Sequence, residues 1–169
     1  VEAILSKPKY HFRAPFFSKI DDAGKVTIQT YTQEIMDLEL RYAKRGGVDF
    51  FAYCTYPLDV GMSRGIEFHN ASRYKNDVAW YFLMHQSIMK DWEKEKAFIV
   101  SNLALPNYHR TPDGRPIIFA FGSSIQKIPG RVDELASAAL AAGLKRPYFA
   151  SMGWDPVGDE TRLKALHFD

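Results

Sequence analysis

Apolar residues along this chain form short runs, and stretches with helical spacing separate these runs. The clearest run spans residues 46–57, where two glycines suited to end the preceding helix are followed by a mostly β-branched or aromatic segment, 48–54. A strand that is apolar on both faces needs cover on both faces, as in α/β proteins. Residues 48–54 therefore predict a buried parallel strand whose carboxyl end opens into a binding site.

The same pattern recurs along the chain roughly every 30 to 40 residues, the length of a βαβ unit. It predicts further strands at 78–83, 117–121 and 147–152, and the start of one more at Phe168. Residues 10–17 alternate bulky and polar groups, and this alternation predicts a first strand there. Apolar stripes at helical spacing predict helices at 32–44, 63–75, 91–103, 132–143 and 161–166. In the third of these, Lys90, Glu93, Lys94, Glu95 and Lys96 are predicted to form the solvated face.

A turn sequence at 21–24 predicts a small β-hairpin between 16–20 and 26–31, after the first strand. We expect this hairpin to cap the mouth of the fold. The length and composition are those of one globular domain, residues 1–169.

Two α/β folds fit this pattern. A five-stranded doubly wound parallel sheet closes within 169 residues, whereas an eight-stranded (β/α)8 TIM barrel needs about 250. However, no glycine-rich phosphate loop follows the first predicted strand, and polar or aromatic groups end all five strands, as on the active face of a barrel. We therefore expect a partial barrel of about five β/α units that is cut at both ends, with the doubly wound sheet as the alternative.

Charge and composition limit the classes of molecule that this chain is expected to bind. The net charge of +2 comes from scattered Lys and Arg with no basic run, so neither a nucleic-acid stripe nor a membrane-binding patch is indicated. No transmembrane stretch is present, and the single cysteine, Cys54, excludes an internal disulfide. Aromatic residues make up 14% of the chain, which fits either a large core or stacking surfaces for sugar rings.

A series of short motifs stands in the order and spacing of a known group of proteins. The motifs are Ala14-Pro15-Phe16-Phe17, Gln33-Glu34-Ile35-Met36-Asp37, Tyr42-Ala43, Gly46-Gly47-Val48-Asp49-Phe50-Phe51-Ala52-Tyr53, Met62-Ser63-Arg64-Gly65-Ile66, Ser72-Arg73, Asp113-Gly114-Arg115-Pro116 and Gly153-Trp154-Asp155. Over nearly its whole length the chain resembles the glycoside hydrolase family 99-like and WbsX-like (β/α) barrel proteins, and it corresponds to about their first five strands.

This resemblance implies a carbohydrate-active barrel whose partner is a glycan or polysaccharide. Such proteins are often bacterial and often part of a larger exported protein, so the resemblance implies an extracellular or periplasmic location, with the rest of the barrel in sequence beyond these residues. The endo-mannosidase members carry paired catalytic glutamates in a Glu-Trp-His-Glu type segment beyond the fifth strand. No such segment occurs in this sequence, so no catalytic role transfers to a residue here. The resemblance therefore implies a glycoside hydrolase when full length, or a non-catalytic glycan-binding or polysaccharide-biosynthesis protein.

Two residues are candidates for catalysis. Asp155 is the only acid directly at the carboxyl end of a predicted strand, and glycoside hydrolysis usually needs two carboxyl groups. It could equally bind backbone amides in the turn before Pro156. His85 ends the strand at 78–83 and could act as a general acid or base, or be a structural histidine.

Other residues are candidates for binding a sugar. Aromatic faces pack on sugar C–H groups, and fixed donors bond to sugar oxygens. The candidates are Trp154, Tyr56, Tyr53, Gln86, His11 and Arg13. Core packing is the alternative for the aromatic residues, and is favoured for Tyr53. The histidines lack a metal-binding spacing and no Gly-x-Ser-x-Gly elbow is present, so no metal or cofactor is predicted.

Overall fold

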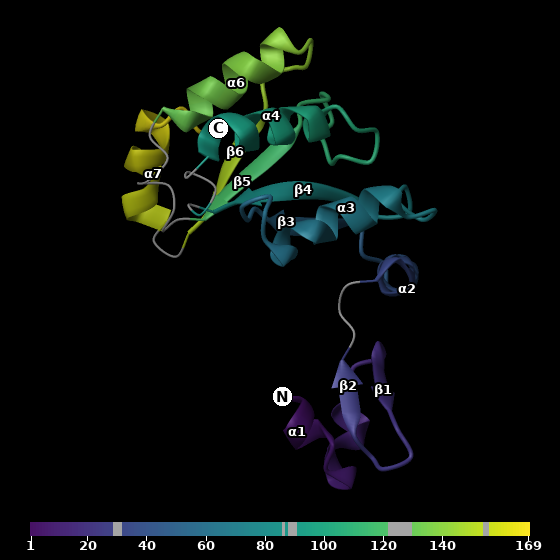
Figure 1. Cartoon of the computed structure of the whole chain (residues 1–169). Coiled ribbons are helices and arrows are strands. Elements are labelled where there is room, and N and C mark those ends of the chain that lie inside the picture. The colour runs from purple at the N-terminus through teal and green to yellow at the C-terminus, as the bar shows by residue number, and fades with distance from the viewer. Residues whose placement is uncertain (29–31, 86, 88–90, 122–129, 154–155) are drawn as a thin grey trace.

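The computed structural model describes residues 1–28, 32–85, 87, 91–121, 130–153 and 156–169 (Figure 1). The chain begins with a small N-terminal unit. This unit contains α1 (Glu2–Leu5), the 3₁₀ helix η1 (Pro8–Arg13), and the strands β1 (Ser18–Ile20) and β2 (Val26–Ile28). The two strands pair antiparallel, so the predicted hairpin is confirmed.

The predicted first strand at 10–17 is wrong, because η1 occupies its first half and no residue of 10–17 is in a strand. Pro8 stands at the start of η1, where its fixed φ favours a helical turn and its missing N–H costs nothing. The backbone N–H of Tyr10 then donates to Lys7 O at 2.8 Å, and that of Ala14 donates to His11 O at 3.0 Å. The alternation of bulky and polar groups therefore belongs in part to a short helix, in which Tyr10 is half-buried and Phe12 is exposed.

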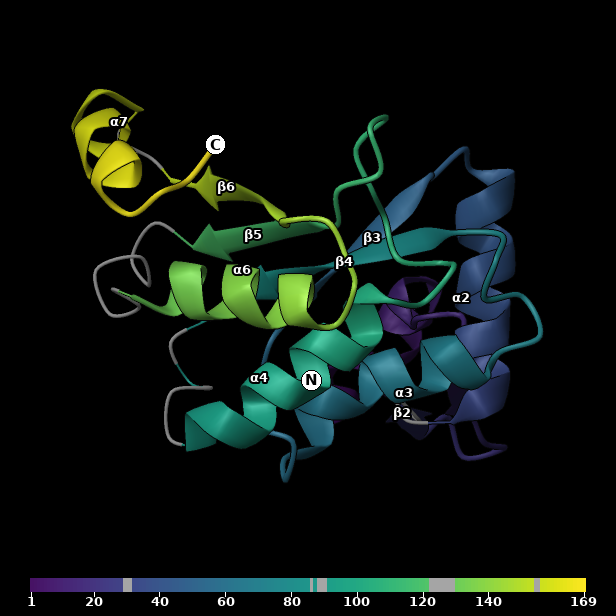
Figure 2. The ribbon, with the colours of Figure 1, turned by 90° about the horizontal axis from the view of Figure 1, so that it is seen from above.

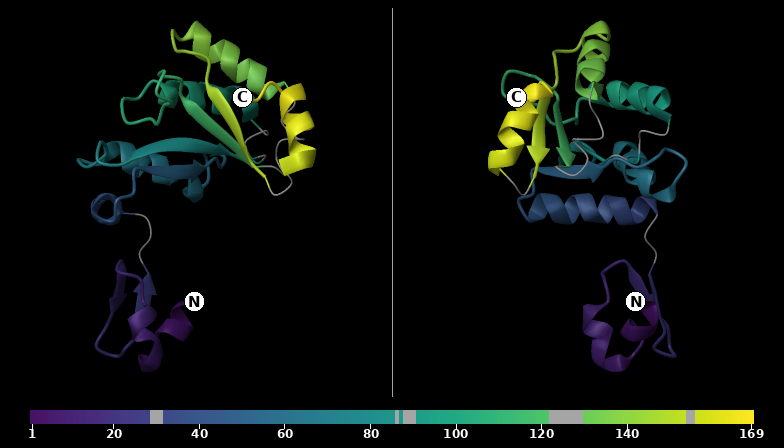
Figure 3. Two further views of the ribbon diagram at one scale, coloured as in Figure 1. Left: turned by 180° about the vertical axis from the view of Figure 1, so that it is seen from behind. Right: turned by 90° about the vertical axis from the view of Figure 1, so that its left-hand side faces the viewer.

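The hairpin does not lie at the mouth of the fold. Phe16, just before β1, packs edge-on against Tyr42 of the helix α2 (Gln33–Arg45), with 5.0 Å between the ring centroids. In Figures 1 and 3 the N-terminal unit lies on the side of α2 that faces away from the sheet.

The rest of the chain builds a parallel sheet, and the α/β class is thereby confirmed. Its strands are β3 (Phe50–Cys54), β4 (Ala79–Met84), β5 (Ile117–Phe121) and β6 (Tyr148–Met152), in the order β3-β4-β5-β6. These are four of the five predicted parallel strands. The connections carry η2 (Gly61–Ser63), α3 (Arg64–Ala71), α4 (Trp92–Leu103) and α6 (Arg131–Ala141), and α7 (Pro156–Ala165) follows β6.

Local sequence explains the boundaries of α2. The Thr32 hydroxyl accepts a hydrogen bond from the Ile35 N–H at 3.3 Å, which satisfies one of the unpaired donors at the helix start. At the other end Gly47 has a φ of 75°, a conformation that glycine adopts without strain. The helix and its glycine stop are as predicted.

One face of the sheet carries the hydrophobic core. Figure 2 shows α3, α4 and α6 together on this face. Alternate strand residues point into them, and Trp80, Phe82, Ile118 and Phe149 are each no more than 1% exposed. Burial of such large side chains is the main source of stability in a domain of this size.

The opposite face of the sheet is also apolar, but it is less covered. The strand register brings Ala52 beside Tyr81, and Leu83 beside Phe119, on this face. At its corners Phe50 and Met152 are each 41% exposed. Among the described residues, cover of this face is therefore incomplete.

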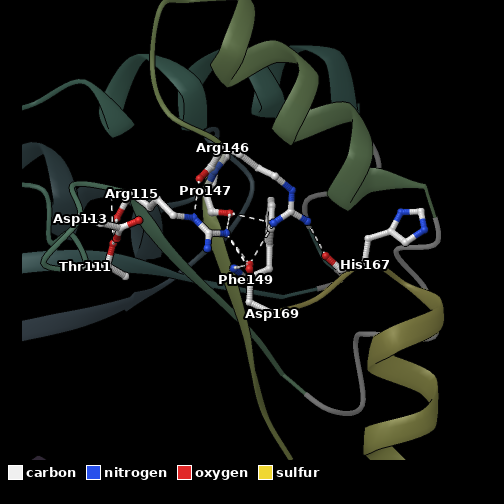
Figure 4. A network of polar contacts seen from close by, with 8 residues as sticks. All are labelled: Thr111, Asp113, Arg115, Arg146, Pro147, Phe149, His167 and Asp169. Atoms are coloured by element: carbon white, nitrogen blue, oxygen red, sulfur yellow. Dashed lines mark hydrogen bonds and ion pairs between the residues drawn. The ribbon is translucent and has the colours of Figure 1, made fainter.

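The residues after α7 return to the amino-terminal end of β6 (Figure 4). The Asp169 carboxylate accepts hydrogen bonds from Arg115 Nη2 at 2.7 Å and from Arg146 Nη1 at 3.0 Å. Burial opposes the charge, but these two guanidinium groups and the Phe149 N–H lower the pKa of Asp169 overall. The Asp169 backbone N–H also donates to Phe149 O at 3.0 Å, so the segment begins to pair with β6 where a strand was expected.

None of the helices in the described part of the chain has the length and apolar character needed to cross a membrane.

Candidate functional site

An open cleft lies at the carboxyl ends of β3, β4 and β5, on the face of the sheet opposite α3, α4 and α6. Its volume is about 370 Å³, and it is lined by Cys54, Tyr56, His85 and Phe121. We call it the strand-end cleft. The rings of Tyr56 and His85 are 6.3 Å apart, and the Phe121 ring stands edge-on to His85 at 6.2 Å. Two candidate residues predicted from the sequence, Tyr56 and His85, are thus brought together.

Hydrogen bonds fix the ring of His85. The backbone N–H of Ser87 points to His85 Nδ1 at 3.2 Å, and the Ser87 hydroxyl lies 2.9 Å from the same nitrogen. A backbone N–H can only donate, so Nδ1 is the acceptor and the ring proton is on Nε2. In this tautomer His85 presents an N–H donor, the group that a neutral sugar oxygen accepts from.

Thr55 ties the ends of β3 and β4 together. Its hydroxyl accepts a hydrogen bond from the backbone N–H of His85 at 2.8 Å, and its carbonyl oxygen accepts one from the Ser87 hydroxyl at 3.3 Å. Thr55 is only 5% exposed, so these bonds are shielded from water. They hold the two strand ends, and with them Tyr56 and His85, in one register.

The Cys54 thiol and the Tyr56 hydroxyl interact within the cleft. Burial raises the pKa of Cys54, and the hydrogen bond with Tyr56 only partly offsets this effect. The same hydrogen bond is the largest cause that raises the pKa of Tyr56. Both groups therefore stay protonated near neutral pH, so Cys54 is a poor nucleophile and Tyr56 is a hydroxyl donor.

Tyr53 does not lie in the cleft. Its side chain is on the helix-covered face, where its hydroxyl is 2.9 Å from His69 Nδ1, and burial raises its pKa. Gly65 on α3 leaves room for the ring, because a Cβ there would lie 3.2 Å from Tyr53 Cε1. Tyr53 is thus a packing residue, the alternative that its strand position favoured.

His11 and Arg13 belong to η1 in the N-terminal unit. His11 Nε2 is 3.1 Å from the carbonyl oxygen of Gly24, so this ring fastens η1 to the hairpin. The Arg13 guanidinium lies over the ring of Phe12, 5.4 Å from its centroid. Because the predicted first strand is absent, neither residue is delivered to the strand ends with Tyr56 and His85.

Three other candidates, Gln86, Trp154 and Asp155, lie outside the described residues.

Two further residues at this end of the sheet have places that the sequence pattern does not predict. Phe121 was predicted only as a strand residue, yet it forms one wall of the strand-end cleft. Glu95 was assigned to the solvated face of its helix, and this is wrong, since it is 4% exposed. Its spacing with Trp92 and Ile99, three residues before and four after, was the signal that places it on the buried stripe.

The described lining of the cleft contains no carboxylate. Over the same described part of the chain, no group of three His, Cys, Asp or Glu side chains is placed to hold a metal ion. What the described lining offers is two aromatic faces, a phenol hydroxyl and an imidazole N–H, which suits binding of a polar ring compound.

The chain matches no protein-family model, no curated protein and no solved structure.

Proposed function

We propose that this chain binds a glycan in the strand-end cleft and is the carbohydrate-binding part of a (β/α)8 barrel of the glycoside hydrolase family 99-like and WbsX-like type. The observation that carries the proposal is the pairing of Tyr56 with His85 at the carboxyl ends of adjacent parallel strands. Carboxyl ends of parallel strands are where (β/α) barrels place their binding residues. A tyrosine ring and an Nε2–H donor are groups that recognise a sugar by stacking and hydrogen bonding.

Three features of the sheet support a barrel over a doubly wound fold. The strands follow one another in chain order, whereas a doubly wound sheet reverses its order at a switch point. The helices α3, α4 and α6 cover the same face. The other face is apolar, like the filled interior of a barrel. On this proposal, the remaining strands belong to polypeptide outside residues 1–169.

The proposal assigns glycan binding, and not catalysis, to the described residues of the strand-end cleft. Glycoside hydrolysis usually needs two carboxyl groups, about 5 to 9.5 Å apart. The described lining of the strand-end cleft offers none. This favours the second candidate function, a non-catalytic glycan-binding or polysaccharide-assembly protein, unless carboxylates reach the cleft from elsewhere in a complete barrel.

Binding of α-mannan oligosaccharides, as a neutral probe, and of oligogalacturonates, as an acidic probe, tests this proposal. We expect calorimetric titration to detect binding to the wild-type chain. Tyr56→Ala and His85→Ala should each weaken it by about tenfold, because each removes a stacking face or a hydrogen-bond donor worth about that factor.

The matched controls are Tyr53→Phe and His11→Ala. They change the same residue types outside the cleft, and we expect both to bind as the wild type does. Wild-type affinity in the double variant Tyr56→Ala, His85→Ala would show that the cleft is not the glycan site.

A further inference from the structure

We infer that Glu95 is a positioning residue for the strand-end cleft: it holds the segment after Tyr56 and thereby keeps the Tyr56 ring beside His85. This inference rests on the proposed function for its role in glycan binding. Its structural part, the holding of Tyr56, stands on contacts that need no glycan.

The position of Glu95 is unusual for a charged residue. It lies in the first turn of α4 and is 4% exposed, whereas its neighbours Glu93 and Lys94 are exposed. Burying a carboxyl group costs free energy unless its oxygens are hydrogen-bonded. A buried glutamate therefore needs a partner nearby.

That partner is the backbone of the loop after β3. Glu95 Oε1 accepts a hydrogen bond from the Leu58 N–H at 3.0 Å. Leu58 is separated from Tyr56 only by Pro57, whose ring fixes φ, so a fixed Leu58 amide restricts the path of the chain at Tyr56. Glu95, Thr55 and Tyr56 also line one small internal cavity.

Tyr56 thus lies between two residues, Thr55 and Leu58, that are held by hydrogen bonds to other parts of the chain. On its amino-terminal side, Thr55 bonds to the His85 N–H. On its carboxyl-terminal side, Leu58 bonds to Glu95, which belongs to the helix that follows His85 in the chain. The first hydrogen bond joins the end of β3 to the end of β4, and the second joins the loop after β3 to α4. Of the two, only the bond to Glu95 holds the chain on the carboxyl-terminal side of Tyr56.

The pKa of Glu95 is raised, mainly because the carboxyl group is buried. The Leu58 N–H and Lys94 lower this pKa by a smaller amount, and Asp91 and Asp59 raise it slightly further. A protonated carboxyl group still has a carbonyl oxygen that accepts from Leu58. The positioning contact therefore needs an acceptor, and not a charge, at residue 95. Glutamine supplies that acceptor, and alanine does not.

The single cysteine provides a direct measurement without glycan. Cys54 lies against the Tyr56 hydroxyl, so release of Tyr56 exposes the thiol. In the chain of 169 residues, we expect iodoacetamide to alkylate Cys54 about tenfold faster in Glu95→Ala than in the wild type. In Glu95→Gln we expect a rate within about twofold of the wild type.

A matched control separates positioning from loss of stability. Leu103→Ala removes a fully buried side chain from the same helix, α4, but Leu103 does not line the small cavity that Glu95 shares with Tyr56, and the Leu58 contact stays intact. We expect it to leave the Cys54 rate nearly unchanged under native conditions. Amide exchange gives a second readout: Leu58 loses protection in Glu95→Ala, while Trp80 in the sheet keeps it.

Two results would overturn the inference: an unchanged Cys54 rate in Glu95→Ala, or an equal increase in Leu103→Ala. If these rates behave as expected, glycan affinity should fall in Glu95→Ala and recover in Glu95→Gln. Absence of any α-mannan or oligogalacturonate binding by the wild type would refute the proposed function alone, because the thiol and exchange measurements do not depend on it.

Discussion

Replacing Trp80 by alanine is expected to lower the free energy of unfolding by about 3–5 kcal/mol. Trp80 is fully buried in the second strand of the sheet, and its ring packs edge-on against Phe82 and Tyr108 with centroids 5.1 and 5.0 Å away. Its Nε1–H donates to Asn70 Oδ1 at 3.2 Å. Alanine leaves a large cavity and removes one of the two hydrogen bonds to Asn70 Oδ1, the other being donated by Asn107 Nδ2 at 3.1 Å, so the loss is mainly one of packing.

Urea unfolding followed by circular dichroism measures this effect. Phe12→Ala is the matched control, because Phe12 is 79% exposed in the N-terminal unit. We expect that change to stay within about 0.5 kcal/mol of the wild type. A Trp80→Ala loss as small as this would mean that Trp80 does not occupy the core between β4 and the helices.

The second large effect is expected for His69→Ala, which should cost about 2–4 kcal/mol. His69 is fully buried; its Nε2 is 3.1 Å from Val78 O and its Nδ1 is 2.9 Å from the Tyr53 hydroxyl. A carbonyl oxygen only accepts, so Nε2 carries the proton and Nδ1 accepts from Tyr53. Alanine leaves the Val78 carbonyl oxygen without this donor and leaves the Tyr53 hydroxyl only the Met36 sulfur, 3.8 Å away.

The same histidine predicts a pH dependence. Burial lowers the pKa of His69 below its ordinary 6.5, and hydrogen bonds to Lys75 and Val78 oppose this only in part. Burial also lowers the pKa of His109. As the pH decreases, these two histidines are protonated in the unfolded chain before they are protonated in the folded chain. The free energy of unfolding is therefore largest above about pH 6.5 and falls as the pH decreases toward the pKa values of the folded state.

Urea unfolding at a series of pH values between about 7 and 5 checks the direction. We expect the wild type to lose stability across this interval, and His69→Gln to lose less, because the contribution of His69 is then absent. A wild-type stability that rises on acidification would mean that these rings are charged in the folded state.

The sequence was sufficient for most of the sheet and insufficient for its amino-terminal flank. The strand at β3 was predictable because apolar residues follow a glycine stop, and Gly47 indeed has a positive φ. Residues 10–17 instead alternate bulky and polar groups, and there Pro8 and local hydrogen bonds give a 3₁₀ helix over the six residues Pro8–Arg13. Two periods cannot be distinguished reliably over six residues.

The sequence predicts which strand ends lie together, because the order of the strands determines that. It does not predict the face of the sheet to which each side chain points. Tyr56 and His85 meet because adjacent parallel strands end at one edge of the sheet. Tyr53 lies on the opposite face, and a strand apolar on both faces gives no indication of which residues point to which side. For Glu95 two signals disagree: its charge predicts the solvated face of the helix, whereas its spacing with Trp92 and Ile99 indicates the buried stripe.

The most direct test of the glycan site uses the five histidines as reporters. They are spread over the N-terminal unit, α3, the strand-end cleft, the segment before β5 and the segment after α7: His11, His69, His85, His109 and His167. Their imidazole signals can be followed by NMR during titration with α-mannan oligosaccharides. We predict a saturable shift of the His85 signals, with the other four unchanged. Saturable shifts at His11 or His109 with His85 unmoved, or no shift at any histidine, would contradict a glycan site at the carboxyl ends of the strands.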